Sequence, residues 1–361
     1  MTHNINRRTF LGLGATAMAG MAFPNILLPE QKKQIGVALL GLGSYSTYQL
    51  GPALEVTSHC KLKGIVTGSP EKIPTWQRRY GIPDRSVYSY ETMHQIANND
   101  DIDVIYIVTP TGTHKDFVLR AAETGKHIWC EKPMAMTEME CEQMISACEK
   151  NRVQLTIGYR VQHEPNTQQL NSYAVSKPFG KMIQASSSAG YRGGGGSGWR
   201  FEKAMGGGAL YDMGVYTVNG LRNATQAEPI EVISAHQYAD RPALFKEVDE
   251  TTTYKLLLSN GIEANGKTSV GENTNHLKVT CARGWYEMRP MQTYSGVNGR
   301  RSDGVLINQY LPNQQANQMD DDALALIQGK SFQIDPIEGL KDIRIIEAII
   351  KTANTGQSVK L

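Results

Sequence analysis

The sequence has almost no excess of charge of either sign. Its 361 residues include 37 lysines and arginines against 35 aspartates and glutamates, a formal net charge of +2, and the basic residues are spread along the chain. A protein that binds nucleic acid concentrates its lysines and arginines on one face or stripe. We therefore expect no nucleic-acid partner.

Cysteines are few and irregularly spaced. The five are Cys60, Cys130, Cys141, Cys148 and Cys281, an odd number without the spacing of a disulfide framework or of a metal-binding motif. Cys141 and Cys148 lie on one predicted helix at a spacing that separates their Cα atoms by roughly 10 Å, too far for a disulfide. We expect structural thiols and no metal site.

Long hydrophobic runs are absent apart from one near the N-terminus. It runs from Gly12 to Phe23 and follows Arg7-Arg8-Thr9-Phe10-Leu11. A twin arginine before a short apolar segment of small residues is typical of a Tat-type export signal, and the segment is too short for a membrane span. We predict a signal peptide over residues 1–30 and a periplasmic protein; an uncleaved N-terminal anchor is the alternative.

From residue 35 the chain alternates apolar strands with segments of helical spacing. The helical segments lie at about 45–58, 71–80, 90–98, 113–125 and 137–150, and the strands are Ile35–Leu40, Lys61–Thr67, Val104–Thr109, His127–Cys130 and Leu155–Gly158. Buried strands separated by helices predict an α/β domain with a doubly wound parallel sheet, a Rossmann domain over residues 31–158.

The second half of the chain has a different pattern. One helix follows Tyr159-Arg160, and two glycine-rich segments follow at 193–196 and 206–208. Strand-like runs then come at about 230–238, 252–258, 262–270, 276–281 and 284–288, a long loop is expected over 291–318, and a last helix runs from about Pro336 to Ala353. This order predicts an α+β domain over residues 159–361 with an open, mostly antiparallel sheet.

A glycine-rich turn follows the first predicted strand directly. Its sequence is Gly41-Leu42-Gly43-Ser44-Tyr45-Ser46. Gly41 permits the tight turn, and Gly43 lets backbone N–H groups approach a pyrophosphate at the helix N-terminus. The third position is Ser46, a small residue that still allows close packing. Strand, turn and helix together predict a dinucleotide site.

The end of the second predicted strand indicates which dinucleotide binds. An NAD site has an acidic residue there for the ribose hydroxyls, whereas this strand ends Val66-Thr67-Gly68-Ser69-Pro70-Glu71-Lys72. Hydroxyl groups with Lys72 nearby suit a 2′-phosphate, so NADP is favoured and NAD stays open. A Tat substrate is exported folded and can carry its nucleotide with it, so we expect the cofactor to stay bound and to be recycled.

Three residues form the candidate catalytic group. Lys132 lies in Cys130-Glu131-Lys132-Pro133, after the fourth strand, at the sheet edge where such folds bind ligands. Asp212 and Tyr216 are four residues apart and share a helix face. A phenol with a pKa near 10 is a poor base, and a nearby ammonium such as Lys132 favours the phenolate. The plain alternatives are a surface lysine and a core tyrosine.

These motifs resemble the Gfo/Idh/MocA oxidoreductase family, and within it the bacterial glucose–fructose oxidoreductases. Most members have His where Tyr216 stands, and the tyrosine is typical of that subgroup. The resemblance runs from about Ile35 to the C-terminal helix. It rests on residues 41–45, 66–72, 130–134, 157–160, 206–220 and 228–232.

The resemblance implies an enzyme that passes a hydride from an aldose to a tightly held NADP(H) and then to a second carbonyl sugar. Lys132 would orient the substrate and assist proton transfer, Tyr216 would be the general acid and base, and Asp212 would bind the sugar. The positions that would contact or cover the cofactor are Gly41, Gly43, Ser44, Tyr45, Thr67, Gly68, Lys72, Tyr90, Thr109, Pro110, His114, Glu131, Lys132, Arg160, Trp199, Arg200 and Tyr294.

Some features of the sequence leave alternatives open. His114 has a structural alternative at the start of a helix, and the loop before Trp199 is glycine-rich where the family has polar residues, so the sugar is not identified. An ordinary NAD(P)-dependent sugar or polyol dehydrogenase, an NAD-dependent oxidoreductive glycosidase and a non-catalytic sensor are the other functions. The expected partners are a carbohydrate substrate and a second copy of the chain, in a dimer or tetramer built through the open sheet.

Overall fold

The computed structural model describes residues 33–193 and 198–361. The predicted signal peptide and most of the glycine run at 193–196 lie outside the described residues. Residues 33–361 form one compact unit, which contains two sheets.

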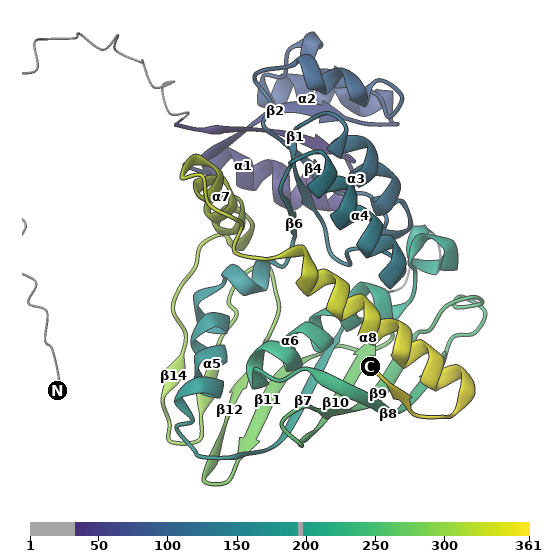
Figure 1. Cartoon of the computed structure of the whole chain (residues 1–361), viewed down its shortest axis with the longest axis vertical. Coiled ribbons are helices and arrows are strands. Elements are labelled where there is room, and N and C mark those ends of the chain that lie inside the picture. Colours follow the sequence, from purple (N-terminus) through teal and green to yellow (C-terminus); the bar gives the residue numbers. More distant parts are fainter. Residues whose placement is uncertain (1–32, 194–197) are drawn as a thin grey trace, which may run out of the picture. The chain divides into compact units, whose positions relative to one another are not determined.

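The first sheet is parallel throughout and has six strands in the order β3-β2-β1-β4-β5-β6 (Figure 1). This order places the carboxyl ends of β1 and β4 next to each other, where the direction of winding reverses and dinucleotides bind. The strands are β1 (Ile35–Leu40), β2 (Cys60–Val66), β3 (Val87–Tyr88), β4 (Val104–Ile107), β5 (His127–Cys130) and β6 (Leu155–Ile157).

Helices cover both faces of this sheet, because its strands are apolar on both sides. Helices α3 (His114–Ala122) and α4 (Glu138–Lys150) pack on one face, and α1 (Gly51–Val56) and α7 (Gln314–Ile327) pack on the other (Figure 1). All six residues of β1 are buried, as a central strand between two helical layers requires. Helix α2 (Ile73–Tyr80) follows β2.

The second sheet has nine strands, and only its β7–β10 pair is parallel. Helix α6 (Val215–Thr225) packs on β7 and α8 (Pro336–Thr355) on β8, while α5 (Pro165–Ser176) lies beside α6 (Figure 1). In spatial order the strands are β14 (Leu306–Ile307), β13 (Gly299–Arg301), β12 (Gly284–Met288), β11 (Thr274–Cys281), β7 (Met182–Gly190), β10 (Glu263–Ser269), β9 (Thr251–Leu258), β8 (Pro229–Tyr238) and β15 (Val359–Lys360).

The predicted fold class is confirmed, with a doubly wound parallel sheet followed by a mostly antiparallel one. Two parts of the expectation for the second half are wrong. Strand β7 was not predicted, because Met182–Gly190 consists largely of serine and alanine rather than of residues typical of strands. The expected loop over 291–318 contains β13 and β14, and α7 begins inside it at Gln314.

Helix α7 follows the second sheet in the chain but packs on the first. Its buried residues are mostly Gln, Ala, Met and Asp, so the apolar periodicity that predicts a helix is weak. Asn313 caps it, since its side chain accepts a hydrogen bond from the backbone N–H of Ala316. The predicted domain boundary after residue 158 stays a prediction.

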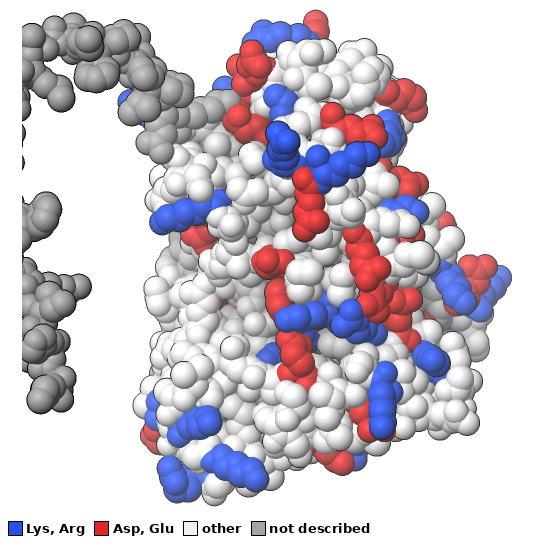
Figure 2. All heavy atoms as spheres, viewed as in Figure 1, with Lys and Arg blue, Asp and Glu red and all other residues white. Residues whose placement is uncertain are grey.

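Cysteines and charges are distributed as in an ordinary folded domain. All five cysteines are buried and unpaired, as the sequence predicts. On the face in Figure 2 the acidic and basic side chains are interspersed, and ion pairs such as Arg344–Glu138 and Lys341–Glu338 join neighbouring helices or turns of one helix. Among the described helices, none combines the length and apolar character needed to cross a membrane.

Candidate active site

The glycine turn after β1 has the geometry of a pyrophosphate site. Gly41 has φ of +96°, and a Cβ there would lie 2.6 Å from the Val108 carbonyl oxygen, so only glycine fits. A Cβ on Gly43 would have no heavy atom within 4 Å, which leaves its backbone open to a ligand. Ser46 is buried and its hydroxyl donates a hydrogen bond to the Gly41 carbonyl at 2.5 Å. The serine that replaces the third glycine therefore fastens the turn.

The predicted 2′-phosphate residues lie beside this turn. The Lys72 ammonium donates a hydrogen bond to the Leu42 carbonyl at 3.0 Å, and the Thr67 hydroxyl accepts one from the Ser69 N–H at 3.0 Å. The Tyr90 ring packs on Gly68, where a Cβ would lie 2.7 Å from the ring. The sequence therefore brings hydroxyl groups and one ammonium to the end of β2.

Glu71, which would argue for NAD, is exposed at the start of a helical turn. Its carboxylate does not replace the acidic residue that an NAD site carries at the end of the second strand. The arrangement around β2 therefore suits NADP.

His114 connects two loops of the site. The ring is buried, with Nδ1 2.9 Å from the Pro133 carbonyl oxygen and Nε2 2.8 Å from that of Thr109, and burial lowers the pKa of His114. Both ring nitrogens are thus occupied by backbone groups, which favours the structural alternative over cofactor contact. The neighbouring Thr109 and Pro110 are half-buried at the carboxyl edge of β4.

Lys132 lies in the turn after β5, where its peptide bond to Pro133 is cis. Its ammonium donates a hydrogen bond to the Asp212 backbone carbonyl at 3.1 Å and lies 3.8 Å from the Asp212 carboxylate. It also lies 4.7 Å from the centroid of the Tyr216 ring. Burial alone lowers the pKa of Lys132, but its interactions with Tyr216, Asp212 and Glu131 outweigh burial and raise it. Lys132 is therefore a cation.

Asp212 holds three groups of the site together. One carboxylate oxygen accepts hydrogen bonds from Arg200 Nε and from the Tyr191 hydroxyl, both at 2.9 Å. Burial alone would raise the pKa of Asp212, but Lys132, Arg200 and Tyr191 lower it. The carboxylate is therefore ionised. Sequence reasoning missed Tyr191, which directly follows the unpredicted strand β7.

Asp212 lies in a π-helical turn, Leu210–Gly214, that leads into α6. Such turns are rare and are frequent at functional sites. The structure brings Asp212 and Tyr216 to the same lysine, as their spacing predicts, although the segment that carries Asp212 is wider than an α-helix.

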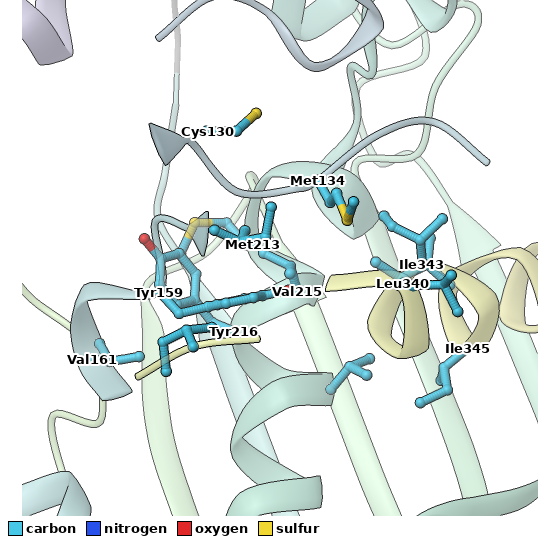
Figure 3. Packing of buried hydrophobic residues seen from close by; sticks show 14 of the residues in the cluster. Cys130, Met134, Tyr159, Val161, Met213, Val215, Tyr216, Leu340, Ile343 and Ile345 are labelled. Atoms are coloured by element: carbon cyan, nitrogen blue, oxygen red, sulfur yellow. The ribbon is translucent and has the colours of Figure 1, made fainter. Parts of the chain in front are cut away.

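Tyr216 combines a buried ring with a hydroxyl that faces a different cation from the expected one. The ring belongs to the apolar cluster where β6 meets α6, together with Tyr159, Val161 and Met213 (Figure 3). The core-tyrosine alternative thus describes the ring. Lys132 lies over the ring, whereas Arg160 Nη2 lies 3.5 Å from the phenol oxygen. Arg160, expected only as a cofactor contact, is therefore a partner of Tyr216.

Glu131 directly precedes Lys132 and is buried. Its carboxylate accepts a hydrogen bond from the Tyr106 hydroxyl at 2.7 Å and one from the Lys132 backbone N–H at 3.2 Å. Burial raises the pKa of Glu131. A Cβ on Gly158, the residue after β6, would lie 2.7 Å from this carboxylate. The glycine therefore leaves room for the Glu131 side chain.

The remaining predicted residues lie at the rim of the site. The Arg200 guanidinium stacks over Trp199 at 4.5 Å, and the rings of Tyr45 and Tyr294 are 5.9 Å apart. Tyr294 is half exposed, as a residue that covers a ligand would be. Ser44 is exposed at the N-terminus of the helix that follows the turn. Within residues 33–193 and 198–361, no group of three His, Cys, Asp or Glu side chains is placed to hold a metal ion.

A glycine turn at the winding reversal of the sheet, with an ammonium, a carboxylate and a phenol at the same edge, defines a dinucleotide-dependent oxidoreductase. The chain belongs to the Gfo/Idh/MocA oxidoreductase family. Residues 35–159 match the family model described as "Oxidoreductase family, NAD-binding Rossmann fold", and residues 167–287 match the GFO/IDH/MocA C-terminal domain. The resemblance that the motifs indicate is thus confirmed.

Solved structures and characterised proteins of similar sequence include sugar oxidoreductases. The aldose–aldose oxidoreductase of Caulobacter crescentus, crystallised with glycerol, is 35% identical, with a TM-score of 0.87 over 91% of this chain and 100% of that one. The D-xylose 1-dehydrogenase [NADP(+)] of Haloarcula marismortui is 25% identical over 90% of this chain and 92% of its own. A 3-ketoreductase of Actinomadura kijaniata, solved with NADP, shares the fold at 20% identity and a TM-score of 0.76.

Proposed function

We propose that this protein is an NADP-dependent sugar oxidoreductase that oxidises an aldose at its anomeric carbon. The observation that carries the proposal is the cluster of Lys132, Asp212 and Tyr216 at the carboxyl edge of the first sheet. Two relatives by name support the substrate class, since one is an aldose–aldose oxidoreductase and one a xylose dehydrogenase.

The residues at the nucleotide turn fit NADP. Gly43 presents open backbone for the pyrophosphate, and Thr67 and Lys72 would hold the 2′-phosphate. When bound, this cofactor would supply a nicotinamide that can take up a hydride and give it back.

Each residue of the cluster then has one task in the oxidation. The Tyr216 oxygen takes the proton of the sugar hydroxyl as the hydrogen on the same carbon leaves with its electron pair, so an aldose becomes a lactone. The Lys132 ammonium donates a hydrogen bond to the sugar oxygen and stabilises the charge that develops there. Asp212 keeps Lys132 charged and in place. In the reverse direction Tyr216 returns the proton to a carbonyl oxygen.

We further propose that the NADP(H) stays bound and is reoxidised by a second carbonyl sugar. The twin arginine at Arg7-Arg8 and the name of the Caulobacter relative support this. In the test, purified protein is given an aldose alone, and the absorbance of reduced nicotinamide is followed. A single turnover that a second sugar reverses supports recycling.

An ordinary NADP-dependent dehydrogenase is the second candidate, favoured by the name of the Haloarcula relative. It predicts many turnovers with free NADP+ and no second sugar. Release of nitrophenol from a nitrophenyl glycoside would instead indicate the glycosidase. Absence of nicotinamide reduction with every sugar tested would contradict all of these activities.

Export by the Tat route and assembly into a dimer or tetramer are part of the proposal. Replacing Arg7 and Arg8 together by lysine should leave the protein in the cytoplasm in a fractionation experiment. Unchanged export would contradict the Tat assignment. Light scattering of the purified protein tests the oligomer, and a monomer mass would contradict it.

A further inference from the structure

Arg160 is a buried cation with no carboxylate partner among the described residues. Its side chain is 2% exposed in the short helical turn after β6. Its terminal nitrogens donate hydrogen bonds to neutral oxygens, those of the Thr293 carbonyl at 3.0 Å, the Gln314 side chain at 2.6 Å and the Gln292 side chain at 3.3 Å. Glu131 interacts with Arg160 electrostatically but forms no direct ion pair with it. A buried charge without a directly paired opposite charge is costly, so the site has a reason to keep it.

Among the described side chains that contact Arg160, Tyr216 is the one that the proposed reaction requires to be an anion. Nη2 lies 3.5 Å from the phenol oxygen, and the guanidinium carbon lies 5.5 Å from the ring centroid. Lys132, by contrast, faces the ring. Each further contact of the guanidinium is to an uncharged side chain or carbonyl, including the half-exposed ring of Tyr294 at 5.1 Å.

Among the described residues around Tyr216, the cations outnumber the carboxylates. Lys132, Arg160 and Arg200 are cations, and Asp212 and Glu131 are the carboxylates that face them. Asp212 is shared by Lys132 and Arg200. Burial raises the pKa of Glu131, against the opposing effects of Tyr106, Lys132 and Arg160.

Neutral tyrosines complete the surroundings of Tyr216. Tyr45 lies beside Tyr294, and burial raises the pKa of both phenols. They stay neutral and do not compensate Arg160.

We propose that Arg160 is the positioning residue that holds the Tyr216 oxygen and stabilises the negative charge that this oxygen carries before it takes the sugar proton and after it gives the proton back. The inference rests on the proposed function. It assigns to Arg160 the stabilisation of the phenolate, a role that the sequence analysis gives to Lys132. Lys132 then acts on the sugar oxygen.

Helix α7 contributes to this arrangement. The Gln314 side chain accepts a hydrogen bond from one nitrogen of Arg160. Gln314 belongs to α7, which packs on the first sheet and not on the second sheet. An uncharged acceptor at this position fixes the guanidinium without neutralising it. Changing Gln314 to glutamate would place a carboxylate on Arg160 while leaving the arginine in place.

The experiment measures both half-reactions of the bound cofactor against pH in wild type, Arg160→Met, Arg160→Lys and Gln314→Glu. Gln328→Glu adds the same charge at the exposed end of α7, roughly 20 Å away along the helix, and is the matched control. An opposite charge within 4–6 Å moves an ionisation by about 1–3 pH units. Stopped-flow absorbance gives the rates, and the nucleotide content of each variant is determined separately.

We expect the rising limb of aldose oxidation to move up by about 1–3 pH units in Arg160→Met and Gln314→Glu. The falling limb of carbonyl reduction, which needs the protonated phenol, should move up with it. Arg160→Lys should keep most of the wild-type profile, and Gln328→Glu all of it. In a Tyr216→Phe background, Arg160→Met should change the residual rate little, because the two residues act as one unit.

Three results would overturn the inference. The first is a fall in the rates of both half-reactions in Arg160→Met and Gln314→Glu while the limbs of their pH profiles stay at the wild-type pH. This would show a structural role. The second is loss of nucleotide from Arg160→Met, with the full wild-type pH profile restored when NADP+ is added. This would show that Arg160 acts as a cofactor contact. The third is an unfolded Arg160→Met with a wild-type profile in Gln314→Glu. A wild type that reduces no nicotinamide with any sugar refutes the proposed function itself.

Discussion

Replacing Tyr216 by phenylalanine removes one oxygen from the site and leaves the ring. The ring is 8% exposed and lies in the apolar cluster below the site, so phenylalanine fills the same volume. Within the described part of the chain, the hydroxyl accepts one hydrogen bond from a side chain, that of Arg160 at 3.5 Å. Loss of so long a hydrogen bond should change the free energy of unfolding by less than about 1 kcal/mol.

The effect on catalysis should be much larger than the effect on stability. General acid–base catalysis contributes about 10²–10⁴-fold to a rate, which is about 3–5 kcal/mol of activation free energy. We expect the single-turnover reduction of bound nicotinamide by an aldose to slow by this factor, with nucleotide content and melting temperature unchanged. Tyr216→His, the residue common in the family, supplies another base and should retain part of the rate.

The assay follows reduced-nicotinamide absorbance after rapid mixing with the aldose. A rate within a factor of a few of the wild type in Tyr216→Phe would refute the role of the phenol. Equal loss of nucleotide and rate would show that the substitution acts on cofactor binding, and the role in proton transfer would then be wrong too.

Three further substitutions test separate parts of the site and the fold. Asp212→Asn removes a charge 3.8 Å from Lys132, an interaction of about 4 kcal/mol at an effective dielectric constant of 20; the pKa of Lys132 should fall, and activity should drop at a lower alkaline pH than in wild type. Lys72→Ala should weaken NADP binding by about 10–100-fold and leave NAD binding unchanged in a titration, and equal loss of both would contradict the 2′-phosphate assignment. Burial raises the pKa of Asp322 to about 7. Because this folded pKa lies above the unfolded value of about 3.9, the contribution of Asp322 to stability is fully present below about pH 4 and is lost as the pH rises to 7. Asp322→Asn should therefore add up to about 4 kcal/mol to the free energy of unfolding above pH 7. Unchanged denaturant midpoints above pH 7 would refute this.

Five of the six strands of the first sheet could be predicted because their signals are local, whereas the two-residue strand β3 was missed. Continuous apolar runs such as Ile35–Leu40 read as central strands, and the glycine turn and Lys132 follow strand ends directly. A parallel sheet brings such strand ends to one edge, so the positions along the chain translate into positions in space. The same reasoning placed Thr67 and Lys72 beside the glycine turn.

The parts that could not be predicted depend on contacts between distant segments. Strand β7 has small residues because α6 packs closely on it, and small residues give no strand pattern. Helix α7 buries a row of polar residues, since its partners are the Arg160 and Tyr106 side chains behind the site. Tyr191 was missed for the same reason, because it follows β7.

The contact between Arg160 and Tyr216 could not be predicted from the sequence either. The motif predicts that Arg160 lies near the cofactor, and this stays a prediction; the structure places it in the turn after β6. Its contact with Tyr216 joins residues 56 positions apart, a pairing that neither motif implies. Which cation faces the phenol oxygen is therefore a property of the packing between the two sheets.

The most direct test of the central claim is a single-turnover experiment on the protein as purified, with no nucleotide added. We predict about one NADP(H) per chain, one equivalent of nicotinamide reduced when an aldose is added, and its reoxidation by a second carbonyl sugar. Protein that carries no nucleotide, or carries one that no sugar reduces, would contradict the claim.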